Sequence, residues 1–242
     1  MDFRHSGEIW RDFPELVPGV LFAEGLSRDV PPAEPRTDGF TAVASARLAG
    51  RSEAELPEIQ AWRRAFSRMG LKPTQYRCAA ESLLRRFRKE GSLPRLHPLV
   101  DLCNAISLAF AIPVAAFDVS GVTGGLEVRY ADGGEEYLTF SGEIEHPAAG
   151  EVIFSDSARR VLARRWTNRQ SGWSAVRDET TAALIVAEAM HDSAASDVAE
   201  LTAAVAAGLA AVWSVTPAVA VLTPSSPVFT FAGQPVSGSP PA

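Results

Sequence analysis

Hydrophobic and polar residues follow a helical period in four segments of the chain. In Glu55–Gly70 the apolar side chains recur every three to four residues, and Gln75–Glu90 carries a similar apolar stripe. Pro98–Phe110 is apolar nearly all round, and Asp197–Ala211 is rich in alanine. We therefore predict two amphipathic helices, one buried helix and one alanine-rich helix near the end of the fold.

Short apolar runs rich in β-branched and aromatic residues predict the strands. Glycine, proline and aspartate turns separate many of these runs, as expected for strands joined by tight loops. The predicted strands are Leu16–Glu24, Phe40–Arg47, Val114–Val119, Leu126–Tyr130, Glu136–Phe140, Glu151–Phe154, Val161–Trp166, Ala182–Ala187 and Ala218–Leu222. Together with the helices they indicate an α+β fold, in which a helical cluster packs on an antiparallel or mixed β-sheet.

Local composition divides the chain into three parts. Residues 1–50 are predicted to be an N-terminal extension whose strands pack on the core, with the proline-rich loop Pro31–Pro35 between them. Residues 51–222 are predicted to form the core domain. Residues 223–242 are rich in proline, glycine and serine, and we predict that this tail is disordered.

The bulk composition excludes several classes of protein. Of the 242 residues 46% are hydrophobic and 21% are charged, which is typical of a globular protein. The net charge of −6 argues against a protein that coats nucleic acid, so DNA is not an expected partner. The amino-terminal residues lack the apolar core of a signal peptide, and no apolar run suits a membrane span. We expect a cytoplasmic protein without a membrane partner.

The residues that most often bind metals or act as redox groups are sparse and scattered. Cys78 and Cys103 lack the spacing of a zinc site or a redox pair, and the four histidines are far apart. The chain also lacks glycine-rich phosphate loops, the GxSxG serine motif and the HExxH metal motif. Neither a metal ion nor a cofactor is therefore expected, and nucleotide-dependent chemistry such as amino-acid activation is disfavoured.

One segment carries a positive charge that differs from the rest of the chain. Between Tyr76 and Arg95 six basic residues stand against two acids, which gives a local charge of +4. The candidates for contact with RNA phosphates are Arg77, Arg85, Arg86, Arg88 and Lys89. The alternative is a solvated helix face whose arginines balance neighbouring acids.

Polar side chains gather at two places that suit a binding pocket. Asp101, Asn104 and Ser107 share one face of the buried helix, where they form either a hydrogen-bond network or a pocket wall. In Arg165–Ser174 two tryptophans interleave with hydrogen-bonding residues, directly after a predicted strand. The pocket candidates from this loop are Asn168, Gln170, Ser171 and Gly172. The other interpretation is that the tryptophans close the sheet edge and the polar groups form turns.

The segment Val100–Asp118, VDLCNAISLAFAIPVAAFD, resembles the B3/B4 module of the phenylalanyl-tRNA synthetase β subunit. That module carries a run close to VVDxTNxxxxxxGQPLHAFD. The residues at matching spacing here are Val100, Asp101, Asn104, Pro113, Ala116, Phe117 and Asp118. The resemblance extends over about residues 75–190. It implies a B3/B4-like fold, tRNA as a partner, and hydrolysis of mischarged aminoacyl-tRNA, which is the reaction of this module in the synthetase.

The same resemblance implies one further pocket residue and shows one departure from the family. In the family, a glutamate at the end of a strand lines the pocket and helps to discriminate the amino-acid side chain. Glu188 looks like that residue, although it lies one or two positions later than expected. The pocket histidine of the family is replaced by Ala115. No catalytic side chain is assigned, because hydrolysis in this fold is expected to use a positioned water molecule.

These features favour a free-standing tRNA-binding protein that deacylates mischarged tRNA in trans, with Asn104, the Arg165–Ser174 loop and Glu188 around its pocket. The chain is too short to hold a complete synthetase. Ala115 favours the alternative, a module that binds tRNA or an amino-acid-like small molecule without catalysis.

Overall fold

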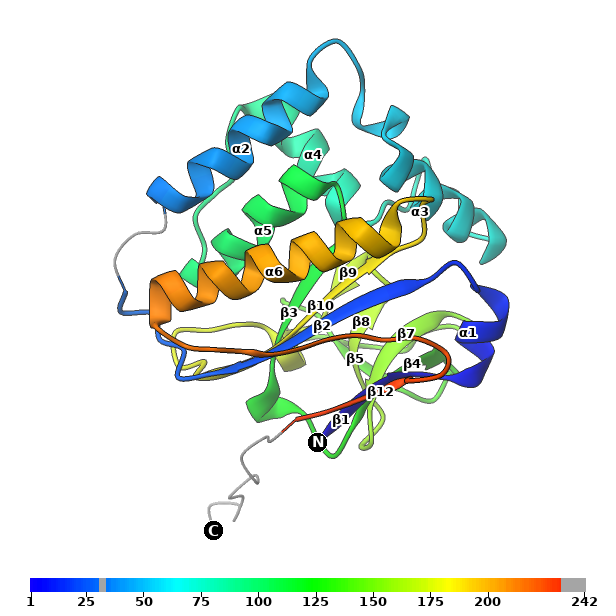
Figure 1. Cartoon of the computed structure of the whole chain (residues 1–242). Coiled ribbons are helices and arrows are strands. Elements are labelled where there is room, and N and C mark those ends of the chain that lie inside the picture. Colours follow the sequence, from blue (N-terminus) through cyan, green and yellow to red (C-terminus); the bar gives the residue numbers. More distant parts are fainter. Residues whose placement is uncertain (31–33, 232–242) are drawn as a thin grey trace.

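The computed structural model describes residues 1–30 and 34–231, which form two β-sheets and a layer of helices (Figure 1). The helices cover one face of a four-stranded sheet, and an eight-stranded sheet packs against its opposite face. The layers are therefore helices, small sheet and large sheet. This arrangement confirms the α+β fold class that the sequence indicates.

Every neighbouring pair in the four-stranded sheet is antiparallel. In spatial order its strands are β11 (Ala218–Val221), β2 (Val17–Glu24), β10 (Ala182–Ala189) and β3 (Val114–Asp118). Strand β10 lies between β2 and β3, and all but its first residue are buried. Its nearly continuous apolar sequence follows from this position: Ile185 packs towards the helices and Leu184 packs towards the large sheet.

The eight-stranded sheet joins strands from both ends of the described chain. In spatial order they are β12 (Val228–Thr230), β1 (Asp2–His5), β4 (Leu126–Tyr130), β7 (Val152–Asp156), β8 (Arg160–Arg164), β5 (Glu136–Leu138) and β6 (Ile144–Glu145), with β9 (Arg169–Gln170) paired to β8. The pairs β1–β4 and β5–β8 are parallel and the others are antiparallel. The sheet is therefore mixed.

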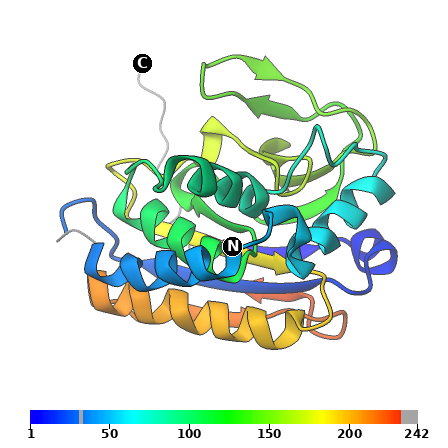
Figure 2. The same cartoon turned by 90° about the horizontal axis from the view of Figure 1, so that it is seen from above.

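The helices are described by their order along the chain. They are α1 (Gly7–Asp12), α2 (Glu34–Leu48), α3 (Pro57–Arg68), α4 (Ala79–Glu90), α5 (Pro98–Phe110) and α6 (Ala194–Trp213), with short 3-10 turns at η1 (Glu53–Glu55), η2 (Val119–Gly121) and η3 (Gly172–Ser174). Helices α5 and α6 pack on the small sheet, and α2 packs on α5 (Figures 1 and 2). The predicted buried helix has the observed bounds of α5.

Close packing holds α6 between β2 and α5. A Cβ atom at Gly19 of β2 would lie 2.5 Å from Thr202, and one at Gly208 would lie 2.8 Å from Leu102. A larger residue at either position would force these neighbouring side chains to shift, so glycine permits the close packing. By length and apolar composition alone α6 would also suit a membrane span. In the fold, Val198 and Leu201 of α6 belong to the hydrophobic cluster that includes Leu21 of β2.

The prediction of a strand at Phe40–Arg47 is wrong, because these residues belong to α2. Alternating threonine, valine and serine suggest a strand, but packing on α5 provides a stronger preference for the helix. Ala44 is fully buried, and Arg47 donates a hydrogen bond to the carbonyl oxygen of Ala109 at the end of α5 (2.8 Å). Tertiary contacts therefore override a weak local pattern.

Both ends of the described chain belong to the sheets. Strand β1 pairs with β4, and β2 lies inside the small sheet, so residues within 1–50 form part of the two-sheet core. Of the tail predicted to be disordered, residues 223–231 contain β12, which pairs with β1. Residues 232–242 and residues 31–33 of the proline-rich loop lie outside the described residues.

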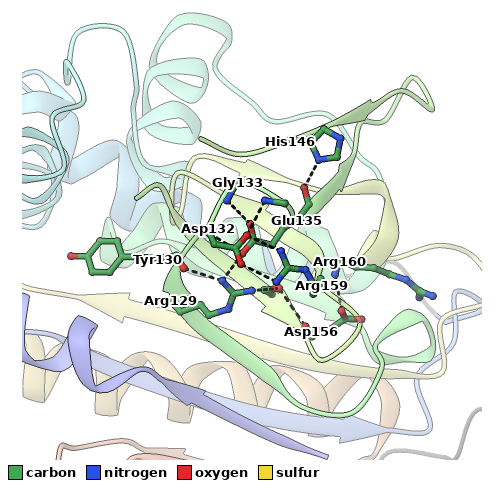
Figure 3. Close-up of polar contacts among 11 residues, drawn as sticks. Arg129, Tyr130, Asp132, Gly133, Glu135, His146, Asp156, Arg159 and Arg160 are labelled. Carbon is green, nitrogen blue, oxygen red and sulfur yellow. Dashed lines mark hydrogen bonds and ion pairs between the residues drawn. The ribbon is translucent and has the colours of Figure 1, made fainter. Parts of the chain in front are cut away.

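A buried carboxylate fixes the turn between β4 and β5 (Figure 3). Glu135 is fully buried and accepts hydrogen bonds from Arg129 Nη1 (2.5 Å) and from the backbone N–H groups of Asp132 (3.1 Å) and Gly133 (3.0 Å). Arg159 forms a two-pronged ion pair with Asp132 across the same turn. Gly133 has φ = +96°, a conformation that glycine adopts without strain. The turn is thus specified by its sequence.

Candidate functional site

A cavity of about 80 Å³ lies between the two sheets, beside the start of α4. Its walls come from β3 and β10 of the small sheet, from β7 and β8 of the large sheet, and from the loop after β8. The lining residues are Ala79, Pro113, Val114, Ala115, Phe117, Phe154, Ala163, Trp166, Thr167, Asn168, Arg169, Gln170, Val186 and Glu188. The cavity therefore combines an apolar interior with a few polar groups, a composition that is typical of small-molecule sites.

Glu188 supplies a buried carboxylate to this cavity. Its Oε1 atom accepts a hydrogen bond from Trp166 Nε1 (2.9 Å) and lies 2.6 Å from Nε2 of His5. Its backbone carbonyl accepts a hydrogen bond from Trp62 Nε1 (3.1 Å). Glu188 and His5 are 2% and 3% exposed, so these bonds offset a desolvation cost that an unpaired carboxylate would retain. The carboxylate is held rigidly at the cavity wall.

Trp166 reaches Glu188 from an unusual backbone conformation. Arg165 and Trp166 have φ values of +46° and +57°, which residues with large side chains rarely adopt. Such a conformation costs on the order of 1–3 kcal/mol and persists only where the surroundings enforce it. Here the N–H of Trp166 donates to the carbonyl oxygen of Val152 (2.7 Å), and its ring packs edge-on against Trp62 and Phe13. The strained turn therefore aims the indole N–H at Glu188.

The amide side chains of the loop attach it to its neighbours. Asn168 Nδ2 donates to the carbonyl oxygen of Arg77 (2.7 Å), and Gln170 Nε2 donates to that of Ala116 in β3 (2.7 Å). The structure thus places Asn168, Gln170 and Glu188 around one cavity, as the sequence analysis expected. Their roles towards a ligand stay predictions.

Ser171 and Gly172 do not line the cavity. Ser171 Oγ donates to the carbonyl oxygen of Leu138 (2.9 Å), so it holds the loop against β5. A Cβ atom at Gly172 would lie 3.2 Å from the carbonyl oxygen of Thr139, which makes this a close backbone approach. Both residues therefore contribute to the shape of the loop behind the site.

Asn104 lies in a different cavity from Glu188. This second cavity has about 400 Å³ and is bounded by α2, α5 and the connection between α4 and α5. The polar face of α5 orders the turns beside it: Asp101 accepts from the backbone N–H of Leu96 (3.0 Å), and Ser107 donates to the carbonyl oxygen of Ile112 (2.6 Å). Asn104 faces the helical layer, so the expected grouping of Asn104 with Glu188 is not found.

The predicted RNA-contacting arginines form ion pairs with neighbouring acids. Arg88 pairs with Glu53 of η1 (3.0 Å), Arg85 lies 3.9 Å from the same carboxylate, and Arg86 pairs with Glu90 (2.9 Å). The charge of +4 was counted between Tyr76 and Arg95. It therefore leaves out Glu53, which lies earlier in the sequence and pairs with two of these arginines. The other two candidates are Arg77, which contacts Glu81 (3.4 Å), and Lys89, which is exposed. Their contact with RNA stays a prediction.

Three contributions to the site carry no local sequence signal. His5 lies 183 residues before Glu188 in the sequence. Trp62 lies on the apolar face of α3, where the sequence indicates only a core residue. The hydroxyl of Thr167 lines the cavity, is buried and makes no hydrogen bond to the described residues, so a ligand can use it.

Cys78 is no nucleophile, because burial raises the pKa of its thiol to about 12.

Comparison with known proteins shows the family to which the chain is similar. The family model described as "B3/4 domain" matches residues 61–203, which is more than half of the chain. The phenylalanine–tRNA ligase β subunit of Cereibacter sphaeroides is 31% identical over 140 residues, which cover 57% of this chain and 16% of that protein. The corresponding subunit of Coxiella burnetii is 40% identical over 60 residues, covering 25% of this chain and 7% of that protein.

A solved structure is similar over most of the chain. It is an N-terminal fragment of the phenylalanyl-tRNA synthetase β subunit from Pyrococcus horikoshii, with a TM-score of 0.46 and 9% identity, covering 89% of this chain and 49% of that one. The matches to the two ligase subunits cover only a small part of the length of those proteins. The family match includes Trp166 and Glu188 but begins after His5. On this match, the chain belongs to the B3/4 domain family.

Proposed function

We propose that this chain binds tRNA and hydrolyses the ester bond of a mischarged aminoacyl-tRNA in trans, with the aminoacyl group in the Glu188 cavity. The observation that carries the proposal is the carboxylate of Glu188, which lines a mostly apolar cavity and is held there by Trp166 and His5. Family membership is the second support, because the relatives that match are phenylalanine–tRNA ligase β subunits.

The cavity favours a compact side chain that carries a hydrogen-bond donor. Phe117, Phe154 and Val186 provide apolar walls, while Glu188 offers an acceptor. A volume of about 80 Å³ suits an amino-acid side chain and leaves the nucleoside outside. A wholly apolar side chain would add no hydrogen bond to those from Trp166 and His5, whereas a donor on the ligand would add a bond to a charged group, worth about 1.5–3 kcal/mol. The proposed substrate therefore has an apolar body and a polar end.

The proposed reaction uses water as the nucleophile. The oxygen of water bonds to the acyl carbon, the ester C–O bond breaks, and the ribose hydroxyl of the tRNA leaves with a proton. The only hydroxyl among the side chains that line the cavity is Thr167, and the Cys78 thiol is kept protonated by burial. The contribution of the protein is thus to position ester and water, which can account for a large part of a rate enhancement.

Helix α4 is the proposed contact for the tRNA backbone. Ala79 at its first turn lines the cavity, and Arg77 just before it is joined to the loop through Asn168. Arg85 and Arg88 are exposed further along the same helix. In these ion pairs the guanidinium groups are exposed (59% and 45%) and the Glu53 carboxylate is buried (4%), so the remaining N–H groups of each arginine can bind phosphate while the pair with Glu53 stays in place.

A panel of mischarged tRNAs tests the proposal. The purified chain is incubated with tRNAs that each carry a different labelled amino acid, and release of the amino acid is followed. We expect accelerated release from a subset of them, and Glu188→Gln should change which amino acids are released. Glu127→Gln is the matched control, because Glu127 pairs with Arg4 outside the cavity. If the chain accelerates the deacylation of none of the tRNAs, the enzymatic proposal fails.

One observation favours a second function, which is binding without catalysis. Ala115 lines the cavity at the position where the family is expected to carry a histidine, and its methyl group can neither donate nor accept a hydrogen bond. A module of this kind would retain an aminoacyl-tRNA or a free amino acid without turnover. Equilibrium binding of a non-hydrolysable aminoacyl-tRNA analogue, measured beside the deacylation panel, separates the two functions.

A further inference from the structure

Three side chains of metal-binding type meet where α3, β10 and α6 converge, outside the Glu188 cavity. Glu58 lies in the first turn of α3, His191 follows β10, and Asp197 lies in the first turn of α6. One ligand atom from each residue lies within 4.8 Å of the other two. Glu58 and His191 are each 7% exposed, and Asp197 is half-buried.

Neighbouring groups hold these side chains in place. His191 Nε2 lies 2.7 Å from Asp197 Oδ2, which also accepts a hydrogen bond from Ser193 Oγ (2.7 Å). Arg47 donates to Glu58 Oε1. When a carboxylate accepts from one ring nitrogen of a histidine, the other nitrogen carries the lone pair that a metal ion requires. The arrangement thus orients His191 and Glu58 before any ion binds.

The orienting bonds leave two buried atoms without a partner in the described residues. These atoms are Oε2 of Glu58 and Nδ1 of His191. An unpaired buried polar atom costs on the order of 1–3 kcal/mol, so two of them in one cluster need an explanation. A cation can accept both lone pairs. It also balances the charge, because two carboxylates stand against the single guanidinium of Arg47.

We propose that Glu58 and Nδ1 of His191 bind a divalent transition-metal ion of the zinc type, while Asp197 holds the imidazole in place through Nε2. An imidazole nitrogen combined with carboxylate oxygens is a ligand set of Zn²⁺, whereas Mg²⁺ and Ca²⁺ prefer oxygen ligands alone. Glu58 is far from His191 and Asp197 in the sequence, so the ligand spacings that predicted the absence of a metal site could not reveal the cluster. This inference does not depend on the proposed function.

The position of the site gives the ion a structural role. Trp62, one turn after Glu58 on α3, donates its indole N–H to the carbonyl of Glu188, and His191 lies three residues after Glu188. An ion bound here joins the starts of α3 and α6 to the end of β10. It would therefore stabilise the wall of the neighbouring cavity from behind.

Metal binding by the full chain, purified without a histidine tag and stripped with a chelator, tests this proposal. We expect one equivalent of Zn²⁺ per chain by calorimetry, a higher melting temperature with Zn²⁺ than after chelation, and visible absorption bands of a bound Co²⁺ ion. Glu58→Gln and His191→Gln should each weaken Zn²⁺ binding by at least about 10–100-fold. His146→Gln, which removes a histidine bonded to the carbonyl of Glu135, should leave binding unchanged.

Two results would overturn the proposal. The first is the absence of stoichiometric Zn²⁺ and Co²⁺ binding by the wild-type chain, in which case buried water satisfies Glu58 and His191. The second is equal Zn²⁺ affinity in the wild type and the folded variants. Should a variant fail to fold, anomalous scattering from wild-type crystals grown with Zn²⁺ decides the question, because an ion located away from these three residues also contradicts the assignment.

Discussion

His5 Nε2 lies 2.6 Å from Glu188 Oε1, and both side chains are removed from solvent. The contact joins β1 in the large sheet to β10 in the small sheet. The matched family region begins at residue 61, so β1 lies outside the match and still supplies a partner for the carboxylate at the cavity. The site is therefore completed by a segment at the start of the chain.

His5→Ala should destabilise the fold and release Glu188 from its fixed position. We expect a loss of about 1–3 kcal/mol in the free energy of unfolding, because the change removes one of two partners of a buried oxygen atom. A double-mutant cycle with Glu188→Ala, measured by urea denaturation, isolates the contact, because alanine removes the acceptor. Additive effects of the two substitutions would mean that the His5–Glu188 contact contributes nothing of its own.

Local patterns predicted those elements whose sequence alone defines a buried face. The bounds of α5 and β4 coincide with the predicted segments, because α5 is a long apolar run with clear end signals and β4 alternates apolar and charged residues between two glycine-containing turns. Strands β1 and β12 were missed, since four and three residues are too few to establish a period. They exist because they pair with each other and with β4.

The candidate site was predictable only where neighbours in sequence are neighbours in space. Asn168 and Gln170 belong to one loop, and the resemblance to B3/B4 modules pointed to Glu188. The hydrogen bonds from His5 and Trp62 depend on how two sheets and a helix pack, which no local pattern encodes. The same reason explains Asn104: its face of α5 turned out to meet α2, an element that the sequence analysis predicted as a strand.

Acid should destabilise the protein partly through Glu135 (Figure 3). Burial raises the pKa of this carboxyl, but hydrogen bonds from Arg129 and from backbone N–H groups outweigh it, so its pKa lies below the ordinary value. A lowered folded-state pKa stabilises the fold above the unfolded value of about 4.3, and this stabilisation is lost as the pH falls through the folded-state pKa. Urea denaturation between pH 7 and pH 3 should show a smaller acid-induced loss in Glu135→Gln.

The control for this prediction is the adjacent residue. Glu136 is exposed, and Glu136→Gln removes the same charge without breaking the network of the turn. Glu135→Gln should also be less stable than the wild type at pH 7, because Arg129 loses its buried partner. Parallel pH profiles for the wild type and both variants would show that Glu135 is not a source of the acid sensitivity.

Ser214→Gly should stabilise the protein. Ser214 ends α6 with φ = +57°, a left-handed conformation that costs a residue with a Cβ atom roughly 1–2 kcal/mol relative to glycine. Part of this gain is offset by the greater freedom of glycine in the unfolded chain, so we expect a net gain of about 0.5–1 kcal/mol. Ser82→Gly, at an exposed position near the start of α4, should have the opposite sign. Thermal denaturation of both variants measures the difference, and a loss of stability at Ser214 would contradict the argument.

Reversing the charge of Arg85 and Arg88 should weaken association with tRNA. Both guanidinium groups are exposed on α4 and pair with Glu53, so Arg85→Glu with Arg88→Glu removes two cations and adds two like charges beside that carboxylate. Binding is measured at several salt concentrations, because each lost phosphate contact lowers the magnitude of the slope of log affinity against log salt by somewhat less than one. Arg4→Glu with Arg11→Glu, two arginines that pair with Glu127 and Asp12 away from α4, changes the net charge by the same amount and is the control. An unaltered slope in the variant of Arg85 and Arg88 would exclude this face of α4 as the RNA contact and would favour a small molecule as the ligand of the Glu188 cavity.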